Sequence, residues 1–87
     1  MIYNVIIPKN LLKFFDKIDL NTKSKIKEKL QNLKENPLPI GSIKLKGIDD
    51  QYRIRLGDYR IRYFINFIDS EILILDIAHR KDIYKKK

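Results

Sequence analysis

Basic and apolar side chains alternate along one short stretch of the chain, Tyr52-Arg53-Ile54-Arg55-Leu56-Gly57-Asp58-Tyr59-Arg60-Ile61-Arg62-Tyr63. Strict alternation indicates a β-strand with one buried face, and here it occurs in two successive runs. Gly57-Asp58 separates the runs, and glycine at the first central position is typical of a two-residue type II′ turn. The stretch therefore predicts an antiparallel β-hairpin.

A two-residue turn also fixes the pairing between the two strands of this hairpin. The expected pairs are Leu56 with Tyr59, Arg55 with Arg60, Ile54 with Ile61 and Arg53 with Arg62. Directly opposed residues share a face of the sheet, so all four arginines should lie on one side. The tyrosine, isoleucine and leucine side chains should lie on the other side and pack on the rest of the domain.

The arginine side of the hairpin has a chemical as well as a structural implication. Like charges directly opposite each other destabilise a sheet, whereas guanidinium groups bind phosphate bidentately and stay charged. We therefore predict that this face binds a phosphate backbone. The alternative is a solvated basic face on which nearby acids, such as Asp58 or Asp82, relieve the repulsion.

The residues before the hairpin predict one strand and two helices. The segment 2–7 is rich in β-branched residues, and Pro8 after it suits the first position of a helix. Helical spacing of apolar residues then predicts two helices, the second with Asn21 as its N-cap and with its end before Pro37. The apolar positions are Leu11, Phe14, Phe15 and Ile18 in the first helix, and Ile26, Leu30 and Leu33 in the second.

These elements follow the order β-α-α-β-β-β and predict one α+β domain over residues 1–87. We expect a mostly antiparallel four-stranded sheet with the helical hairpin packed on one face. The expected strands are 2–7, 52–56, 59–67 and 71–78, with a loop over 37–50. The register of the last strand stays open, because the length of the turn at Asp69-Ser70 decides whether Asp76 faces the core.

The composition of the chain excludes several classes of function. The chain has 87 residues, a net charge of +8, one histidine and no cysteine. Disulfides and a cysteine or histidine zinc centre are thereby excluded, and we expect neither a metal nor a cofactor. The start of the chain lacks the features of a signal peptide, and no apolar run is long enough to span a membrane, so we expect a cytoplasmic protein. A small domain this basic usually binds a polyanion, most often nucleic acid.

The residues after the last expected strand bring further reactive groups together, in the run His79-Arg80-Lys81-Asp82-Ile83-Tyr84. An antiparallel last strand should return near Arg60, at the same edge as the arginine cluster. Histidine suits general acid–base chemistry, and tyrosine can stack on a base or donate a proton. The plainer alternatives are an inert exposed histidine and an Ile83-Tyr84 pair that covers the core.

The hairpin and this ending together resemble the RelE/ParE superfamily of toxins from toxin–antitoxin systems, in particular its RelE-like branch. The stretch Lys44-Leu45-Lys46-Gly47 also fits, and the resemblance covers the whole chain. It implies a ribosome-dependent endoribonuclease, an mRNA interferase, that cleaves mRNA in the ribosomal decoding site by attack of the RNA 2′-hydroxyl on the adjacent phosphate. It also implies inhibition by a cognate RelB-like antitoxin.

The same resemblance implies roles for individual residues. Arg60 and Arg80 would stabilise the charge that builds on the phosphate, and Tyr84 would stack on or protonate near the scissile site. The remaining residues expected to bind RNA are Arg53, Arg55, Arg62, Lys46 and Lys81. Well-studied members carry lysines where this chain has Arg53 and Arg55, and a guanidinium cannot act as a base. The proton acceptor is then His79, Tyr84 or a group on the ribosome, and of these we expect His79.

Two other functions are compatible with this fold. A ParE-like toxin inhibits DNA gyrase and cleaves no RNA, and a non-catalytic RNA-binding module would use the arginines only to hold the backbone. The arginine pairs and the terminal histidine, arginine and tyrosine favour the nuclease. The basic face also predicts a partner with acidic and amphipathic helical character.

Overall fold

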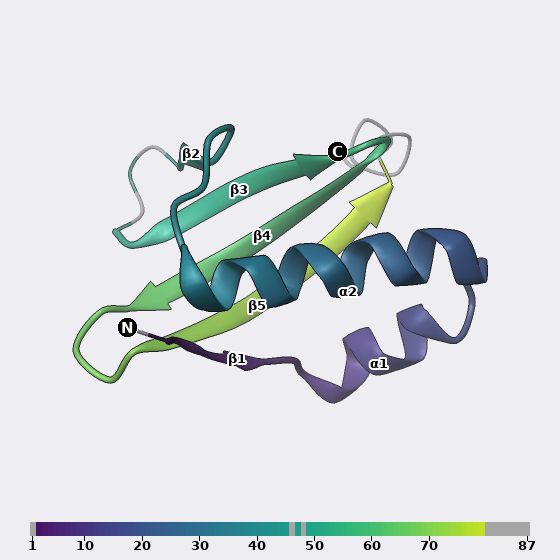
Figure 1. Cartoon of the computed structure of the whole chain (residues 1–87), viewed down its shortest axis with the longest axis horizontal. Helices are drawn as coiled ribbons and strands as arrows, with labels where there is room; N and C mark the ends of the chain where they lie inside the picture. Colours follow the sequence, from purple (N-terminus) through teal and green to yellow (C-terminus); the bar gives the residue numbers. More distant parts are fainter. Residues whose placement is uncertain (1, 46, 48, 80–87) are drawn as a thin grey trace.

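The computed structural model describes residues 2–45, 47 and 49–79. In this part of the chain, two helices pack on one face of a five-stranded sheet, as Figure 1 shows. The strand order is β1-β5-β4-β3-β2, in which β1 is parallel to β5 and the other neighbours are antiparallel. The elements are β1 (Asn4–Ile6), α1 (Lys9–Phe15), α2 (Leu20–Glu35), β2 (Ile43–Lys44), β3 (Gln51–Leu56), β4 (Tyr59–Asn66) and β5 (Glu71–His79).

The α+β class and the element order are confirmed, but the expected number of four strands was wrong. The additional strand is β2, which pairs with β3 inside the segment expected to be a loop. Its register joins Ile43 to Arg53 and Lys44 to Tyr52. A strand of two residues is too short to show an alternating pattern, so its sequence carries no signal that separates it from a loop.

Both helix starts differ by one or two residues from expectation. Pro8 is the N-cap of α1 rather than its first residue. The N-cap of α2 is Asp19, not Asn21, because Asp19 accepts hydrogen bonds from the Thr22 backbone NH (3.0 Å) and hydroxyl (2.7 Å). Both hydrogen bonds lower the pKa of Asp19, and the bond from the Thr22 hydroxyl has the larger effect. No helix in the described part of the chain is long and apolar enough to cross a membrane.

The apolar face of the hairpin packs on the two helices as predicted. Ile54, Ile61 and Tyr63 are buried together with residues of both helices and of β5. The rest of the buried cluster is Leu11, Phe15, Ile26, Leu30, Leu33, Ile65, Ile72, Ile74 and Ile77. The Tyr63 ring stacks on Tyr52, and its hydroxyl donates a hydrogen bond of 2.8 Å to the Pro37 carbonyl. Burial raises the pKa of Tyr63 to about 12.

A β-bulge in β5 settles the register that the sequence left open. From the turn, Asn66 pairs with Glu71 and Tyr63 with Ile74, but the next residue of β4, Arg62, pairs with Asp76. Leu75 is therefore the extra residue, and the side chains after it change face. As a result Ile77 is buried and Asp76 lies on the arginine side of the sheet.

Candidate nucleic-acid interface

The predicted pairing of the hairpin is confirmed residue by residue. Arg53 pairs with Arg62 and Arg55 with Arg60, while Gly57 has a φ of +60° and Asp58 a negative φ, as a type II′ turn requires. All four arginines therefore lie on the face of the sheet opposite the helices. We call this face, with its β5 residues Asp76 and Ala78, the arginine face.

The arginine face forms two rows across three strands. One row runs from Arg55 through Arg60 to Ala78, and the other from Arg53 through Arg62 to Asp76. Directly opposed side chains begin about 5 Å apart at Cβ. Four guanidinium groups and one carboxylate leave these rows with three net positive charges. A surface of this charge and spacing suits a sugar–phosphate strand.

The four arginines differ in their partners. Arg62 Nη2 donates to Asp76 Oδ2 at 2.9 Å, and the side chains of this pair are 43% and 40% exposed. Arg55 Nε donates to the Gly57 carbonyl at 3.0 Å, which leaves its Nη groups for a ligand. Within the described residues, Arg53 and Arg60 form no ion pair. Carboxylates of the described residues therefore relieve the repulsion at one arginine of the four.

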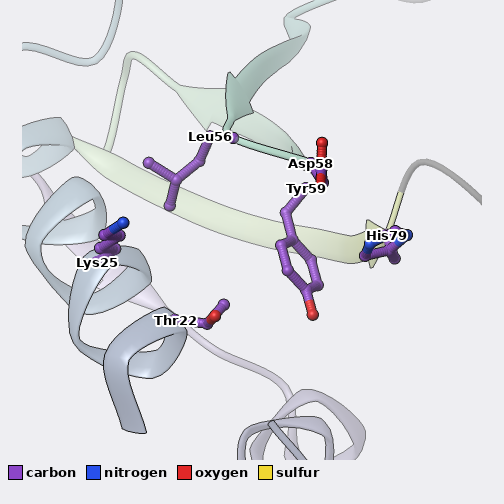
Figure 2. Close-up of a pocket in the computed structure, with 7 residues that line it drawn as sticks. Thr22, Lys25, Leu56, Asp58, Tyr59 and His79 are labelled. Atoms are coloured by element: carbon purple, nitrogen blue, oxygen red, sulfur yellow. The ribbon is translucent and has the colours of Figure 1, made fainter. Parts of the chain in front are cut away.

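Asp58, one of the acids expected to relieve this repulsion, forms no ion pair in the described part of the chain. It lies instead in the turn beside the cleft shown in Figure 2. Asp82, the other expected acid, lies outside the described residues. Within residues 2–45, 47 and 49–79, the basic face is thus neutralised only at Arg62, by Asp76.

His79 lies on the other face of the sheet. The expected return of β5 to Arg60 is confirmed, because Ala78 pairs with Arg60. Side chains alternate along a strand, however, so the next residue, His79, pairs with Tyr59 and points to the helix side. The two rings meet edge to face, with their centroids 5.1 Å apart. With Thr22 and Lys25 of α2, they line the cleft in Figure 2.

Four of the residues assigned to RNA lie outside the described residues, and their roles remain predictions: Arg80, Tyr84, Lys46 and Lys81. Conversely, Asp76 was not among the expected site residues, although the structure places it on the arginine face, where its carboxylate accepts a hydrogen bond from Arg62. The continuous apolar run Ile72–Leu75 hides the bulge, because such a run does not show which side faces the core.

Comparisons with known proteins agree with this architecture. Residues 6–84 match the family described as the ParE toxin of type II toxin–antitoxin systems. The RelE1 protein of Methanocaldococcus jannaschii is 36% identical over 98% of both chains, and toxin RelE3 of that organism is 33% identical over 92% of this chain and 93% of its own. An archaeal RelE–RelB complex from Pyrococcus horikoshii OT3 gives a TM-score of 0.83 at 35% identity, over 92% of this chain and 97% of that one.

The mostly antiparallel sheet covered by two helices is thus shared with a solved archaeal toxin, and the sequence is similar to those of bacterial and archaeal toxins. The chain belongs to the RelE/ParE superfamily of type II toxin–antitoxin toxins. Within it, the relatives named RelE and the solved RelE–RelB complex place the chain in the RelE-like branch.

Proposed function

We propose that this toxin is a ribosome-dependent endoribonuclease that cleaves mRNA in the decoding site. The arginine face is the observation that carries the proposal. Three of its guanidinium groups are free of internal carboxylates within the described residues, and they lie in the two rows that an RNA backbone would follow. Fixed cations stabilise a phosphate most strongly when they are held in place before the reaction.

The proposed reaction uses the RNA's own 2′-hydroxyl as the nucleophile. Its oxygen forms a bond to the adjacent phosphorus while the bond from phosphorus to the 5′-oxygen breaks, which leaves a 2′,3′-cyclic phosphate and a 5′-hydroxyl. Negative charge builds on the non-bridging oxygens in the transition state. Arg60 opposes Ala78, whose side chain is a single methyl group, so we expect a phosphate to approach Arg60 from that side. Arg53 and Arg55 would hold the flanking phosphates.

The partner proposed for this toxin is a RelB-like antitoxin. The relative from Pyrococcus horikoshii OT3 was solved as a RelE–RelB complex, and the net charge of +8 here favours an acidic partner. Association through this face should weaken as salt is raised, because exposed charges are screened. An affinity that does not change between low and high salt would contradict the charge part of this proposal.

Cleavage by the purified toxin on translating ribosomes tests the nuclease. The Arg60→Gln variant removes one charge from the arginine face, and we expect cleavage to slow by about 100-fold, the effect of losing one fixed donor to a transition-state oxyanion. Lys27→Gln is the matched control, because it removes the same charge from the exposed side of α2. It should cleave within about twofold of the wild-type rate, since it lies away from the proposed site.

The same preparation separates the two competing functions. Trapped breaks in DNA bound to gyrase, with intact mRNA, would identify a ParE-like inhibitor. Binding to RNA with neither activity would identify a non-catalytic module. Either result would overturn the nuclease proposal.

A further inference from the structure

Among the described residues, those assigned so far leave the proposed nuclease without a proton acceptor on the arginine face. The guanidinium groups there cannot serve, because arginine does not give up its proton in proteins. His79 points to the helix side of the sheet with Tyr59. A base for an RNA strand on the arginine face must come from another residue.

Two carboxylates of β5 lie on this side of the sheet, Asp76 and Glu71. Glu71 pairs with Asn66, which is six residues along β4 from Arg60 and so about 20 Å away. Asp76 is much closer, because it pairs with Arg62 in the row next to Arg60 and Ala78. Two residues along a strand separate these rows, which corresponds to about 7 Å. A phosphate held by Arg60 above Ala78 would therefore lie beside the Asp76 carboxylate.

The bulge supports a functional role for this carboxylate. Without the bulge, Leu75 would pair with Arg62, and Asp76 would lie opposite Ile61, on the buried side. Bulges are common next to active sites, where they redirect a side chain. Here the bulge turns a carboxylate away from the core and onto the arginine face.

Neither RNA binding nor the stability of the fold explains well why a carboxylate occupies this position. A negative charge on a phosphate-binding face weakens RNA binding by repulsion. An ion pair with both side chains about 40% exposed, as Arg62 and Asp76 are, adds little to stability. Its geometry is nevertheless well defined, because Arg62 holds one carboxylate oxygen, Oδ2, at 2.9 Å. No hydrogen bond within the described residues occupies the other oxygen, Oδ1.

We propose that Asp76 is the general base of this nuclease and that Arg62 is the residue that orients it. This inference rests on the proposed function. Asp76 takes the proton of the 2′-hydroxyl as the 2′-oxygen bonds to phosphorus. The bond from phosphorus to the 5′-oxygen breaks with its electron pair on that oxygen, which takes a proton from water. The carboxylic acid then returns its proton to solvent.

The Asp76→Asn variant separates a base from a carboxylate that only offsets charge. It keeps the size of the side chain and an oxygen that can accept from Arg62, but it cannot take a proton. We expect mRNA cleavage on ribosomes to fall by at least about 100-fold, as for the loss of a general base. Binding of a short fluorescent RNA, measured by anisotropy, should be equal or tighter, because a negative charge is removed. If cleavage and binding both rise, Asp76 only offsets charge and the proposal is wrong.

Two further variants separate a base from a positioning residue. Asp76→Glu keeps a carboxylate and should recover at least about tenfold of the cleavage lost in Asp76→Asn. Arg62→Gln keeps the base but frees it, so it should lose less cleavage than Asp76→Asn. Equal losses in Arg62→Gln, Asp76→Asn and the double variant would show that Asp76 acts only through Arg62. Thermal unfolding of each variant confirms that the protein folds.

The wild-type toxin distinguishes failure of this inference from failure of the proposed function. If the wild type leaves mRNA intact on ribosomes, the nuclease proposal and the base assignment both fail. If the wild type cleaves and Asp76→Asn cleaves at the same rate, the nuclease stands and only the assignment of Asp76 is overturned.

Discussion

Neighbouring residues form the two faces of the β3–β4 hairpin, but the inner face is buried and mostly apolar, whereas the outer face carries opposed arginines. On the inner face, Ile61 and Tyr63 are fully buried, and the one polar group of this pair, the Tyr63 hydroxyl, has a hydrogen-bond partner. On the outer face, Arg60 and Arg62 oppose other arginines across the strands. The inner face therefore maximises the stability of the fold, whereas the outer face accepts repulsion that a bound phosphate would relieve.

The largest expected effect is a loss of stability when the packing of the inner face is disrupted and the outer face is left unchanged. Ile61→Ala should lower the free energy of unfolding by about 4 kcal/mol, because it leaves a cavity beneath a residue with no exposed surface. Urea unfolding followed by circular dichroism measures the change. Arg60→Gln, at the adjacent residue, is the control and should change stability by less than about 1 kcal/mol. Similar losses in the two variants would show that the faces are not separable.

A smaller loss of stability is expected when Tyr63 is replaced, and its size should differ between neutral and high pH. Near neutral pH, Tyr63→Phe should be less stable than the wild type by about 1–2 kcal/mol, because the Pro37 carbonyl loses its donor. The folded protein holds the pKa of Tyr63 at about 12, above the ordinary value of 10. Folding thus favours the protonated hydroxyl, and this contribution is complete below pH 10 and is lost as the pH rises through 12.

Between pH 10 and 12, the stability of wild type relative to Tyr63→Phe should therefore fall by about 2 kcal/mol. Urea unfolding of both proteins across this range measures the difference and cancels the titration of the other tyrosines and lysines. A constant difference across the range would mean that burial of the hydroxyl does not oppose its ionisation.

The smallest expected change in stability tests whether the opposed arginines of the outer face repel one another. Arg53→Gln removes one member of a directly opposed arginine pair and should raise the free energy of unfolding by about 0.5 kcal/mol. RNA binding should weaken, and the slope of log K against log salt should become shallower by about one unit. Arg53→Lys keeps the charge and should keep the slope. A loss of stability in Arg53→Gln would contradict the assignment of repulsion to this pair.

The sequence predicts the hairpin and the helices well because each is defined by short-range rules. A two-residue turn at Gly57-Asp58 leaves one pairing for the strands, and so the arginines could be placed before the structure was known. The positions of Asp76 and His79 could not. In β5, one extra residue in a continuous apolar run reverses the face of everything after it, and no residue near Leu75 marks the bulge.

The capping of α2 illustrates a second limit of prediction. Asp19 and Asn21 are both good capping residues two positions apart, and only the hydrogen bonds to Thr22 decide between them. The edge strand β2 illustrates a third, because its two residues pair with β3 through tertiary geometry rather than through a pattern of their own. Local chemistry predicts the elements, and long-range pairing decides their details.

The place of β5 in the sheet also governs when the arginine face can form during synthesis. It is the last strand of the described chain in sequence, yet it lies between β1 and β4 in space. A nascent chain that ends before residue 71 has no neighbour for β1 and lacks one wall of the hydrophobic core. Such a chain cannot complete the sheet that aligns its cationic side chains, so the arginine face cannot form before β5 has been synthesised.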